Sequence, residues 1–511
     1  MKAVRKSFIN EINKYKNKRI VFWGASLFLE EILNTTDFGE NNILGIIDNN
    51  SQRWNEKISD YEIFEPEKIN TLKPKYILIS ILNLNKDSYM KLKKEIKQKF
   101  PKVKILPNVL LRKKPFDISN RLRWLFLLLD NFIPKNKNKI TFMSCPDFSD
   151  NAKEYYEYLY NNHKEEFDIV WLYNDINSNM QNFVETKSYF ARSLKGIWQL
   201  LTSKYIVNTV LTTMVYNPKK HVILQLWHGM PLKTLGYIEK NIEEIIFEKY
   251  KKYGKYSYFF VSSDIFKLSM ISCFYMNPNN IFITGQAKTD CILTNKNKEK
   301  IENILDIKKY SKVVIYAPTY KESLRNSKRE INKDFNNIFY CDDYSQQEFF
   351  GVLEKNNILL IIKPHPLEEN FYKKYTATGA LDHPNIKIFY DCDMKKNDVY
   401  FYDFFKFADL MITDFSSIAI DYLISEKPVI FMNSLSEEYS KNRGFILEDN
   451  YELLMPGAKV STFKQLISAM EDALTIDSWK KERTEKIPLL HKYLDSNSAN
   501  RIFNVMKNIE L

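Results

Sequence analysis

The stretch Val222-Ile-Leu-Gln-Leu-Trp-His-Gly-Met-Pro-Leu-Lys233 decides the fold of this chain. Its apolar run predicts a buried strand, and Trp227-His228-Gly229 predicts a tight loop directly after that strand. In open α/β sheets, ligands bind beyond the carboxyl ends of the strands. The stretch therefore predicts an α/β sheet that presents a histidine at its ligand-binding edge.

Two more apolar runs end in polar side chains of a related kind. The run at 358–362 leads into Lys363-Pro-His365-Pro366, and the run at 410–413 leads into Asp414-Phe-Ser416-Ser417, which a helical pattern follows. Because the carboxyl ends of parallel strands share one edge of a sheet, these side chains belong near a common ligand. Three strand ends that carry His, His and Ser-Ser predict one composite site.

The composition indicates a large globular chain. At 511 residues it is long enough for about three domains of roughly 100–200 residues each. The 27% charged content argues against a polytopic membrane protein, and the longest apolar run, 124–129, is too short for a bilayer, which needs about 20 residues. The start of the sequence lacks the apolar stretch of a signal peptide, and the five cysteines are scattered without metal spacing. We therefore expect a cytoplasmic protein with reduced thiols.

The charge balance favours an anionic partner. The formal net charge is +12 and the isoelectric point is about 9.0. The lysines are spread along the whole chain, however, and no helix-turn-helix, RNA-binding signature or zinc finger is present. A nucleotide, a phosphate or a lipid surface is therefore expected as partner, and nucleic acid is not.

The strand and helix patterns predict five consecutive segments and an α/β fold class. These are a Rossmann-like accessory module at 1–112, a basic amphipathic connector at 113–137, one α/β domain at 138–293, a second at 294–480 and a C-terminal helix at 481–511.

Two of these segments allow two interpretations each. In the first module, Gly24 and Asp48 hold the spacing of a dinucleotide site, but the full G-x-G-x-x-G is missing, so a nucleotide site and a plain accessory module both stay open. In the connector, Trp124 lies beside a leucine cluster with Arg121 and Arg123. Such a helix suits an anionic membrane surface, and it equally suits an interdomain position that buries its leucines.

An ordered set of motifs carries a specific resemblance. They are Trp227-His-Gly-Met-Pro-Leu-Lys233, Tyr316-Ala-Pro-Thr319, Lys363-Pro-His-Pro366, Thr413-Asp-Phe-Ser-Ser-Ile-Ala-Ile-Asp421, Glu438-Tyr439, Arg443-Gly-Phe445 and Pro456-Gly457. In this order and spacing, over roughly residues 140–480, the chain resembles the CDP-glycerol glycerophosphotransferase family of teichoic-acid primases and polymerases. Any one of these motifs alone would be a weak signal.

The resemblance implies a GT-B architecture, in which two Rossmann-like domains face each other across a cleft. It implies transfer of a polyol phosphate, glycerol phosphate first, from a CDP-activated donor to a hydroxyl of a cell-surface polymer or lipid-linked acceptor, with release of CMP. Such an enzyme makes a teichoic-acid-like or capsular polymer of the cell envelope, and a peripheral position on the inner membrane surface fits its basic charge. Met230, Tyr320, Phe415 and Lys288 stand where the family usually has Thr, Trp, Tyr and Arg. These departures leave glycerol and ribitol open as donor alcohols.

The two histidines of the motifs are the expected catalytic residues. An acceptor hydroxyl is a poor nucleophile at neutral pH, and a histidine with an ordinary pKa of about 6.5 can take its proton. The resemblance gives His228 this role of general base and makes His365 a ligand of the donor phosphates. The other four histidines, at 163, 221, 383 and 491, lack such motifs and are expected at the surface.

The donor-binding residues are expected around the same strand ends. Ser416 and Ser417 precede a helical pattern, and helix-start amides with hydroxyls form an anion site, although ordinary helix capping explains the same serines. The complete expected donor-binding set is Gly229, Thr319, Lys321, Ser416, Ser417, Asp421 and Arg443.

No cofactor and no metal are expected beyond the CDP-polyol donor. Asp391-Cys-Asp393 matches the D-x-D that holds a divalent ion in other transferases, but so short a match also arises by chance. Two other functions stay open: a GT-B glycosyltransferase that uses a CMP- or UDP-sugar for capsule synthesis, and a catalytically inactive binding scaffold. The acceptor, the choice between primase and polymerase, and the oligomeric state do not follow from the sequence.

Overall fold

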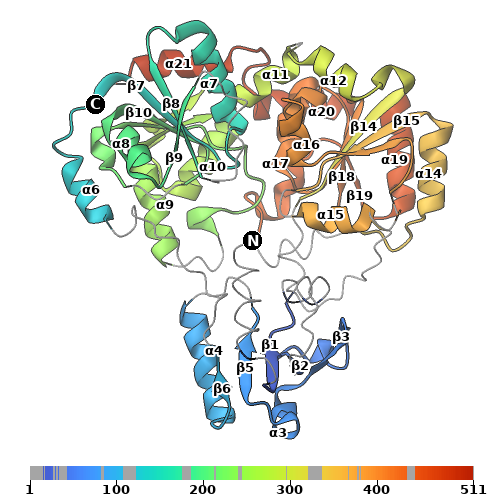
Figure 1. Cartoon of the computed structure of the whole chain (residues 1–511). Coiled ribbons are helices and arrows are strands. Elements are labelled where there is room, and N and C mark those ends of the chain that lie inside the picture. Colours follow the sequence, from blue (N-terminus) through green and yellow to red (C-terminus); the bar gives the residue numbers. More distant parts are fainter. Residues whose placement is uncertain are drawn as a thin grey trace. The chain divides into compact units, whose positions relative to one another are not determined.

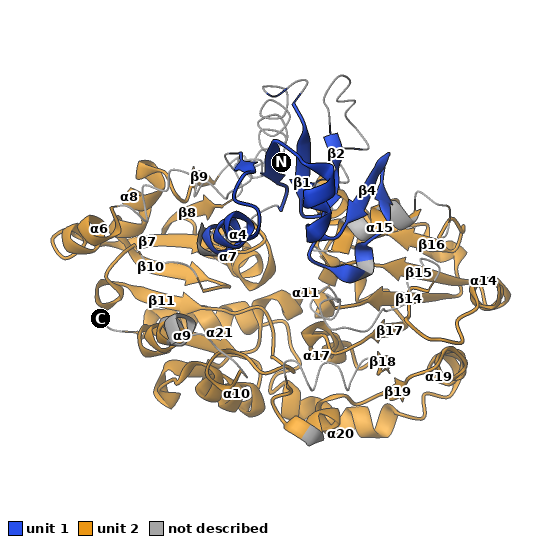
Figure 2. Ribbon diagram, turned by 90° about the horizontal axis from the view of Figure 1, so that it is seen from below, with its two compact units in different colours: residues 1–117 blue, residues 118–511 orange. Residues whose placement is uncertain are grey.

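The computed structural model describes residues 15, 18–26, 29, 33, 43–81, 86–106, 122–174, 186–211, 215–239, 244–294, 296–319, 337–365, 368–376, 379, 381–433 and 444–509. The chain forms two compact units, residues 1–117 and residues 118–511, which Figure 2 colours separately. The division falls inside the predicted connector. Each unit is described by itself.

The first unit is a small Rossmann-like module. Its sheet has the order β3-β4-β2-β1-β5-β6, and every pairing is parallel except that between β3 and β4. Its helices α3 and α4 span Ile69–Leu72 and Lys86–Lys99. The strands are β1 (Ile20–Trp23), β2 (Ile43–Ile47), β3 (Lys57–Ile58), β4 (Tyr61–Phe64), β5 (Tyr76–Ile79) and β6 (Lys104–Ile105).

The second unit contains two parallel sheets, and the first has the order β13-β12-β11-β10-β7-β8-β9 (Figure 1). Its strands are short apolar runs because helices cover both faces of a parallel sheet. They are β7 (Asn136–Met143), β8 (Asp168–Tyr173), β9 (Lys187–Phe190), β10 (Ser203–Asn208), β11 (Val222–Gln225), β12 (Ser257–Val261) and β13 (Ile281–Ile283). The accompanying helices are α6 (Arg123–Leu129), α7 (Asp150–His163), α8 (Leu194–Thr202), α9 (Glu244–Tyr256), α10 (Asp264–Phe274) and α11 (Asp290–Leu293).

The second sheet has the order β16-β15-β14-β17-β18-β19, which is the doubly wound order of a dinucleotide-binding fold. Its strands are β14 (Lys312–Ala317), β15 (Ile358–Ile362), β16 (Ile386–Ile388), β17 (Leu410–Thr413), β18 (Val429–Met432) and β19 (Ala458–Val460). Its helices are α12 (Lys298–Ile304), α14 (Gln346–Lys355), α15 (Glu369–Thr376), α16 (Asp391–Lys396), α17 (Ser417–Tyr422), α19 (Phe463–Thr475) and α20 (Lys480–Leu490).

The last helix, α21 (Ser498–Lys507), returns to the first sheet. Figure 1 shows α21 beside α7. The α21 residues Ile502, Phe503 and Met506 belong to the same buried cluster as Phe142 of β7 and Tyr155 of α7. A second and larger buried cluster contains residues of both sheets, so apolar packing joins the two domains into one unit. The predicted fold class, a pair of Rossmann-like domains after a small Rossmann-like module, is confirmed.

The expectation that the other histidines lie at the surface is wrong for three of them. His221, His383 and His491 are buried. His221 Nε2 contacts Asp130 Oδ2 at 2.9 Å, and His491 Nε2 donates to the Ile420 carbonyl at 2.6 Å. Each of these rings has a polar partner inside the fold. Such pairing depends on tertiary contacts, which the pattern of residues along the sequence does not reveal.

Candidate active site

The strand β11 delivers His228 to the edge of the first sheet, as predicted. The turn begins with Trp227, whose φ of 53° is left-handed and whose amide donates to Gln225 Oε1 at 3.1 Å. The Trp227 and His228 rings stack at 4.3 Å. His228 Nδ1 donates to the Thr209 carbonyl at 3.0 Å, because a carbonyl can act here as acceptor alone. In the neutral ring this leaves the lone pair on Nε2, which is the atom that can take a proton.

The surroundings keep the His228 ring neutral. The residue is exposed, yet the protein around it desolvates the ring, and this desolvation is the main cause that lowers its pKa. Asp150 and Asp421 oppose the shift, and the Lys288 ammonium adds to it. A lowered pKa favours the neutral imidazole at neutral pH, as a general base requires.

The loop after His228 lies directly against the start of α17 in the other domain. Gly229 has a φ of 135°, and a Cβ at this position would stand 3.1 Å from Ser417 Oγ and 3.5 Å from Asp421 Oδ2. Glycine is therefore required both by the backbone conformation and by the close approach. Four predicted site residues, His228, Gly229, Ser417 and Asp421, are thus brought together across the two domains.

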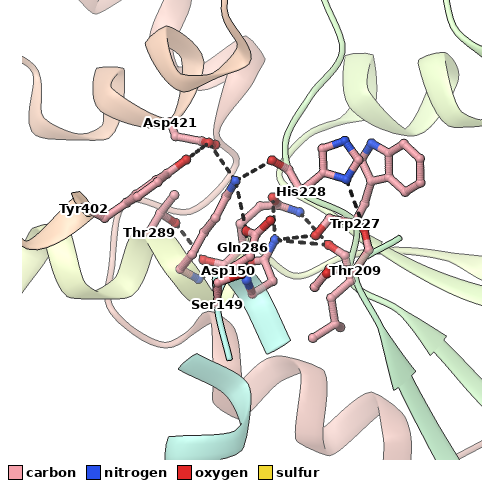
Figure 3. A network of polar contacts seen from close by, with 12 residues as sticks. Ser149, Asp150, Thr209, Trp227, His228, Gln286, Thr289, Tyr402 and Asp421 are labelled. Carbon is pink, nitrogen blue, oxygen red and sulfur yellow. Dashed lines mark hydrogen bonds and ion pairs between the residues drawn. The ribbon is translucent and has the colours of Figure 1, made fainter. Parts of the chain in front are cut away.

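A buried lysine occupies the centre of this contact. Lys288 Nζ donates to the His228 carbonyl at 2.6 Å and pairs with Asp421 Oδ2 at 3.0 Å and Asp150 Oδ1 at 3.4 Å. The Tyr402 hydroxyl donates to Asp421 Oδ2 at 2.6 Å. Figure 3 shows Tyr402 and Asp421 on one side of this network, His228 and Trp227 on the other, and Asp150 between them.

The buried side-chain amides of Asn151 and Gln286 hold the backbone around the residue before His228. Asn151 Nδ2 donates to the Trp227 carbonyl at 3.0 Å and to Gln286 Oε1 at 3.0 Å. Gln286 Nε2 donates to the Phe260 carbonyl at 3.1 Å, and the Lys288 amide donates to Asn151 Oδ1 at 3.0 Å. Asp150, Asn151, Gln286 and Tyr402 are site residues that the sequence did not predict. Ser149, Asp150 and Asn151 are residue types common at helix N-termini and so mark the start of α7, which holds the first two, whereas nothing local marks Tyr402.

In the second domain, Thr319 lies next to the carboxyl end of β17, because β14 and β17 are neighbours in the sheet. The Thr319 amide and hydroxyl donate to the Asp414 carboxylate at 2.9–3.1 Å. Ser416 caps α17 and accepts from the Ile418 amide at 3.4 Å. These two strands flank the point at which the strand order reverses, where nucleotides bind in folds of this kind.

His365 follows β15 at the same edge and is half-buried. Desolvation is the largest cause that lowers its pKa, and the positive charges of Lys363 and Lys233 add to the shift. Lys233 belongs to the first domain, and its segment crosses to the second: Lys233 pairs with Phe445 in an antiparallel bridge, and the Thr234 amide donates to the Gly444 carbonyl at 3.1 Å.

The expected donor contacts of three predicted residues are not tested by the structure. Lys321 and Arg443 lie outside the described residues, so their expected donor contacts stay predictions. Asp421 is buried and holds Lys288 and Tyr402, and its expected donor contact also stays a prediction.

The D-x-D aspartates are engaged with the protein. Asp391 Oδ1 lies 2.8 Å from Lys363 Nζ, and Asp393 Oδ2 accepts from the Tyr390 amide at 3.0 Å. Within the described ranges, no group of three or more His, Cys, Asp or Glu side chains is placed to hold a metal ion.

The family model of CDP-glycerol:poly(glycerophosphate) glycerophosphotransferases matches residues 125–508, which covers both domains of the second unit. The chain belongs to this family. It is therefore a transferase, and the predicted transfer of polyol phosphate from a CDP donor is confirmed at the level of the family. A separate family model, described as C2185-like N-terminal, matches residues 16–106 of the first unit.

Two curated relatives agree with this assignment, and a solved structure has the same fold. The chain is 26% identical to a teichoic acid poly(glycerol phosphate) polymerase of Bacillus spizizenii over 66% of this chain and 84% of that protein. It is 26% identical to a teichoic acid glycerol-phosphate primase of Bacillus subtilis over 62% of this chain and 76% of that protein. The solved wall teichoic acid polymerase TagF has the same fold, with a TM-score of 0.58, 18% identity, and coverage of 82% of this chain and 97% of that chain.

Proposed function

We propose that this enzyme transfers glycerol phosphate from CDP-glycerol to a hydroxyl of a growing polymer, with His228 as the general base. The observation that carries the proposal is the His228 hydrogen bond to the Thr209 carbonyl, which assigns the proton to Nδ1 and the lone pair to Nε2. The close approach of the Gly229 backbone to Ser417, where an added Cβ would stand 3.1 Å from Oγ, supports it, since it brings the His228 loop next to α17 of the second domain.

The reaction is an in-line displacement at phosphorus. The acceptor oxygen forms a bond to the phosphorus that carries the glycerol, and the hydroxyl proton passes to His228 Nε2. The bond between that phosphorus and the bridging oxygen breaks, and CMP leaves with the electron pair. His228 then releases its proton to solvent.

The donor phosphates are assigned to the second domain. The proposed contacts are His365, Ser416 and Ser417, together with Lys321 and Arg443. Thr319, whose amide and hydroxyl both donate to Asp414, is proposed to hold that carboxylate beside the donor. The positive charges of Lys363 and Lys233 near His365 support this assignment, because they suit a diphosphate. No step of this scheme needs a metal ion.

A panel of donors tests the proposal. The purified protein is offered CDP-glycerol, CDP-ribitol, CMP-sugars and UDP-sugars in turn, with a lipid-linked or polymer acceptor, and products are read by mass spectrometry. We expect CMP release and a new phosphodiester with CDP-glycerol. Turnover with CDP-ribitol alone would change the donor but keep the reaction, whereas a glycosidic product from a sugar nucleotide would overturn it. An inactive scaffold would give no product with any donor.

We further propose that the enzyme works at an anionic membrane surface, through a patch made of α6, α8 and the residues after α6. The side chains of Trp124, Phe132, Leu194 and Trp198 are 54–79% exposed, and Arg192 and Lys195 beside them are exposed as well. Both helices anchor in one buried cluster through Phe126 and Ile197, so they cover the same part of the first sheet. Apolar side chains with a basic surround are typical of interfacial binding. Among the described helices, none is long and apolar enough to span a bilayer.

Vesicle sedimentation tests this patch. We expect the protein to pellet with vesicles that contain anionic lipid, and a Trp124→Ser/Phe132→Ser variant to stay in the supernatant. Leu268→Ser, which removes an exposed apolar side chain of α10, serves as the matched control. Equal binding of both variants would contradict a membrane role of the patch.

A further inference from the structure

Lys288 is a buried cation between the two domains of the second unit. It belongs to the short segment Ala287–Thr289 after β13, and its side chain is 2% exposed. Its ammonium has three N–H groups, and three acceptors surround it: the His228 carbonyl, Asp421 Oδ2 and Asp150 Oδ1. The donor capacity of this side chain is therefore fully used.

The cation is held by charge as well as by geometry. Burying an ammonium is costly unless it is paired and hydrogen-bonded. Burial alone would lower the pKa of Lys288, but attraction to Asp150 and Asp421 outweighs it and leaves the pKa raised. Nζ also lies 5.1 Å from the centre of the Tyr402 ring, within the range of a cation–π contact. Lys288 therefore stays charged at neutral pH.

The three acceptors belong to different parts of the site. The carbonyl is the backbone of His228 itself, Asp150 begins α7 of the first domain, and Asp421 lies in α17 of the second domain. The first residue of α17 is Ser417, whose Oγ would stand 3.1 Å from a Cβ added at Gly229. One side chain thus links the backbone of the histidine to the helix that presents the donor-side serine.

We propose that Lys288 is a positioning residue, which ties the His228 loop to α17 and so fixes the base relative to the donor across the two domains. The inference rests on the proposed function, because it requires His228 to act on the acceptor hydroxyl. Lys288 acts through the loop backbone and through α17, and it contacts no reacting atom in this account.

Lys288→Met is the main test, because methionine keeps an unbranched apolar stem and removes the three donors. A displacement of about 1 Å in a reacting group can cost about 100-fold in rate. We expect kcat to fall about 10- to 100-fold while the Kd of CDP-glycerol changes less than about threefold. Lys288→Arg, which keeps the charge, should restore part of the rate. Lys298→Met, at the exposed first residue of α12, is the matched control and should match the wild type.

The pH profile separates positioning from a general loss of structure. The charged groups that face His228 are Asp150 on α7, Asp421 on α17 and Lys288 itself. Loss of the cation leaves two carboxylates that raise the pKa of His228, so the acid limb of kcat/KM should move to higher pH in Lys288→Met. It should return toward its original place in Lys288→Arg. Asp150→Asn should move it the opposite way, to lower pH.

The outcomes distinguish failure of the inference from failure of the proposed function. Wild-type kcat in Lys288→Met, or a slow enzyme whose acid limb has not moved, would overturn the positioning role. Full activity of His228→Ala would instead overturn the proposed function, whatever Lys288 does. If Lys288→Met does not fold by circular dichroism, then Lys288→Arg and Asp150→Asn decide: an unmoved acid limb in Asp150→Asn overturns the inference.

Discussion

His228 and His365 occupy the same kind of position in two different domains. Each follows a buried parallel strand, and desolvation is the main cause that lowers the pKa of each. Their charged neighbours differ. Both kinds of charge face each ring, but their order differs. At His228 the largest charge effect is that of Asp150, which opposes the shift, as Asp421 does, while Lys288 adds to it. At His365 the largest charge effects are those of Lys363 and Lys233, which add to the shift and outrank the opposing Asp391 and Asp414.

The difference in charge suits the two rings to different roles. Carboxylates near His228 favour the imidazolium that forms when the ring takes a proton, so they suit a base. Lysines near His365 disfavour an imidazolium but attract phosphate oxygens, so they suit a ring that contacts the donor. In the proposed mechanism, the environment of each ring, more than the ring itself, separates acceptor chemistry from donor binding.

The largest effect is expected on removal of the base. His228→Ala should lower turnover about 100-fold or more, because general-base assistance is typically worth about 10²–10⁴ in rate. The measurement is CMP release at saturating CDP-glycerol. His163→Ala is the matched control, since His163 ends α7 and contacts Glu166 Oε1 away from the site. Turnover of His228→Ala equal to that control would remove the base from the mechanism.

A smaller effect is expected on the donor side. His365→Ala should lower kcat/KM for CDP-glycerol about 10- to 100-fold, the loss expected for one hydrogen bond to a charged phosphate. Because the contact forms with the bound donor, most of this loss should appear as a higher KM. If His365→Ala left KM unchanged and lowered kcat alone, the donor-binding role of His365 would be contradicted.

The smallest effect concerns pH. The base must be neutral, and the pKa of His228 is lowered from its ordinary value. Activity should therefore persist as pH falls through about 6.5, the ordinary histidine value, and decline only at lower pH. The pH dependence of kcat/KM measures this in the free enzyme. An acid limb above that ordinary value would show that the carboxylates near His228 outweigh its desolvation.

Much of the fold followed from the sequence because buried parallel strands are continuous apolar runs. The run that begins at Val222 became β11, the run at 358–362 became β15, and the run at 410–413 became β17. The turn chemistry of Trp227-His228-Gly229 also placed the histidine correctly at the sheet edge. These features are local, and a single sequence displays them.

The central lysine did not follow from the sequence. Lys288 stood out as a departure from the usual arginine, but its contacts to His228, Asp150 and Asp421 arise from three segments far apart in the chain. The three buried histidines were misplaced for the same reason. Polar pairing inside a fold depends on tertiary contacts, and the periodicity of apolar residues along the sequence does not predict it.

Equilibrium binding of CDP-glycerol to the wild type, His228→Ala and His365→Ala tests the central claim most directly. If the two histidines divide acceptor chemistry from donor binding, His228→Ala should bind the donor with the wild-type Kd although it turns over slowly. His365→Ala should bind it about 10-fold or more weakly. The reverse pattern, with donor affinity lost in His228→Ala and kept in His365→Ala, would contradict the account.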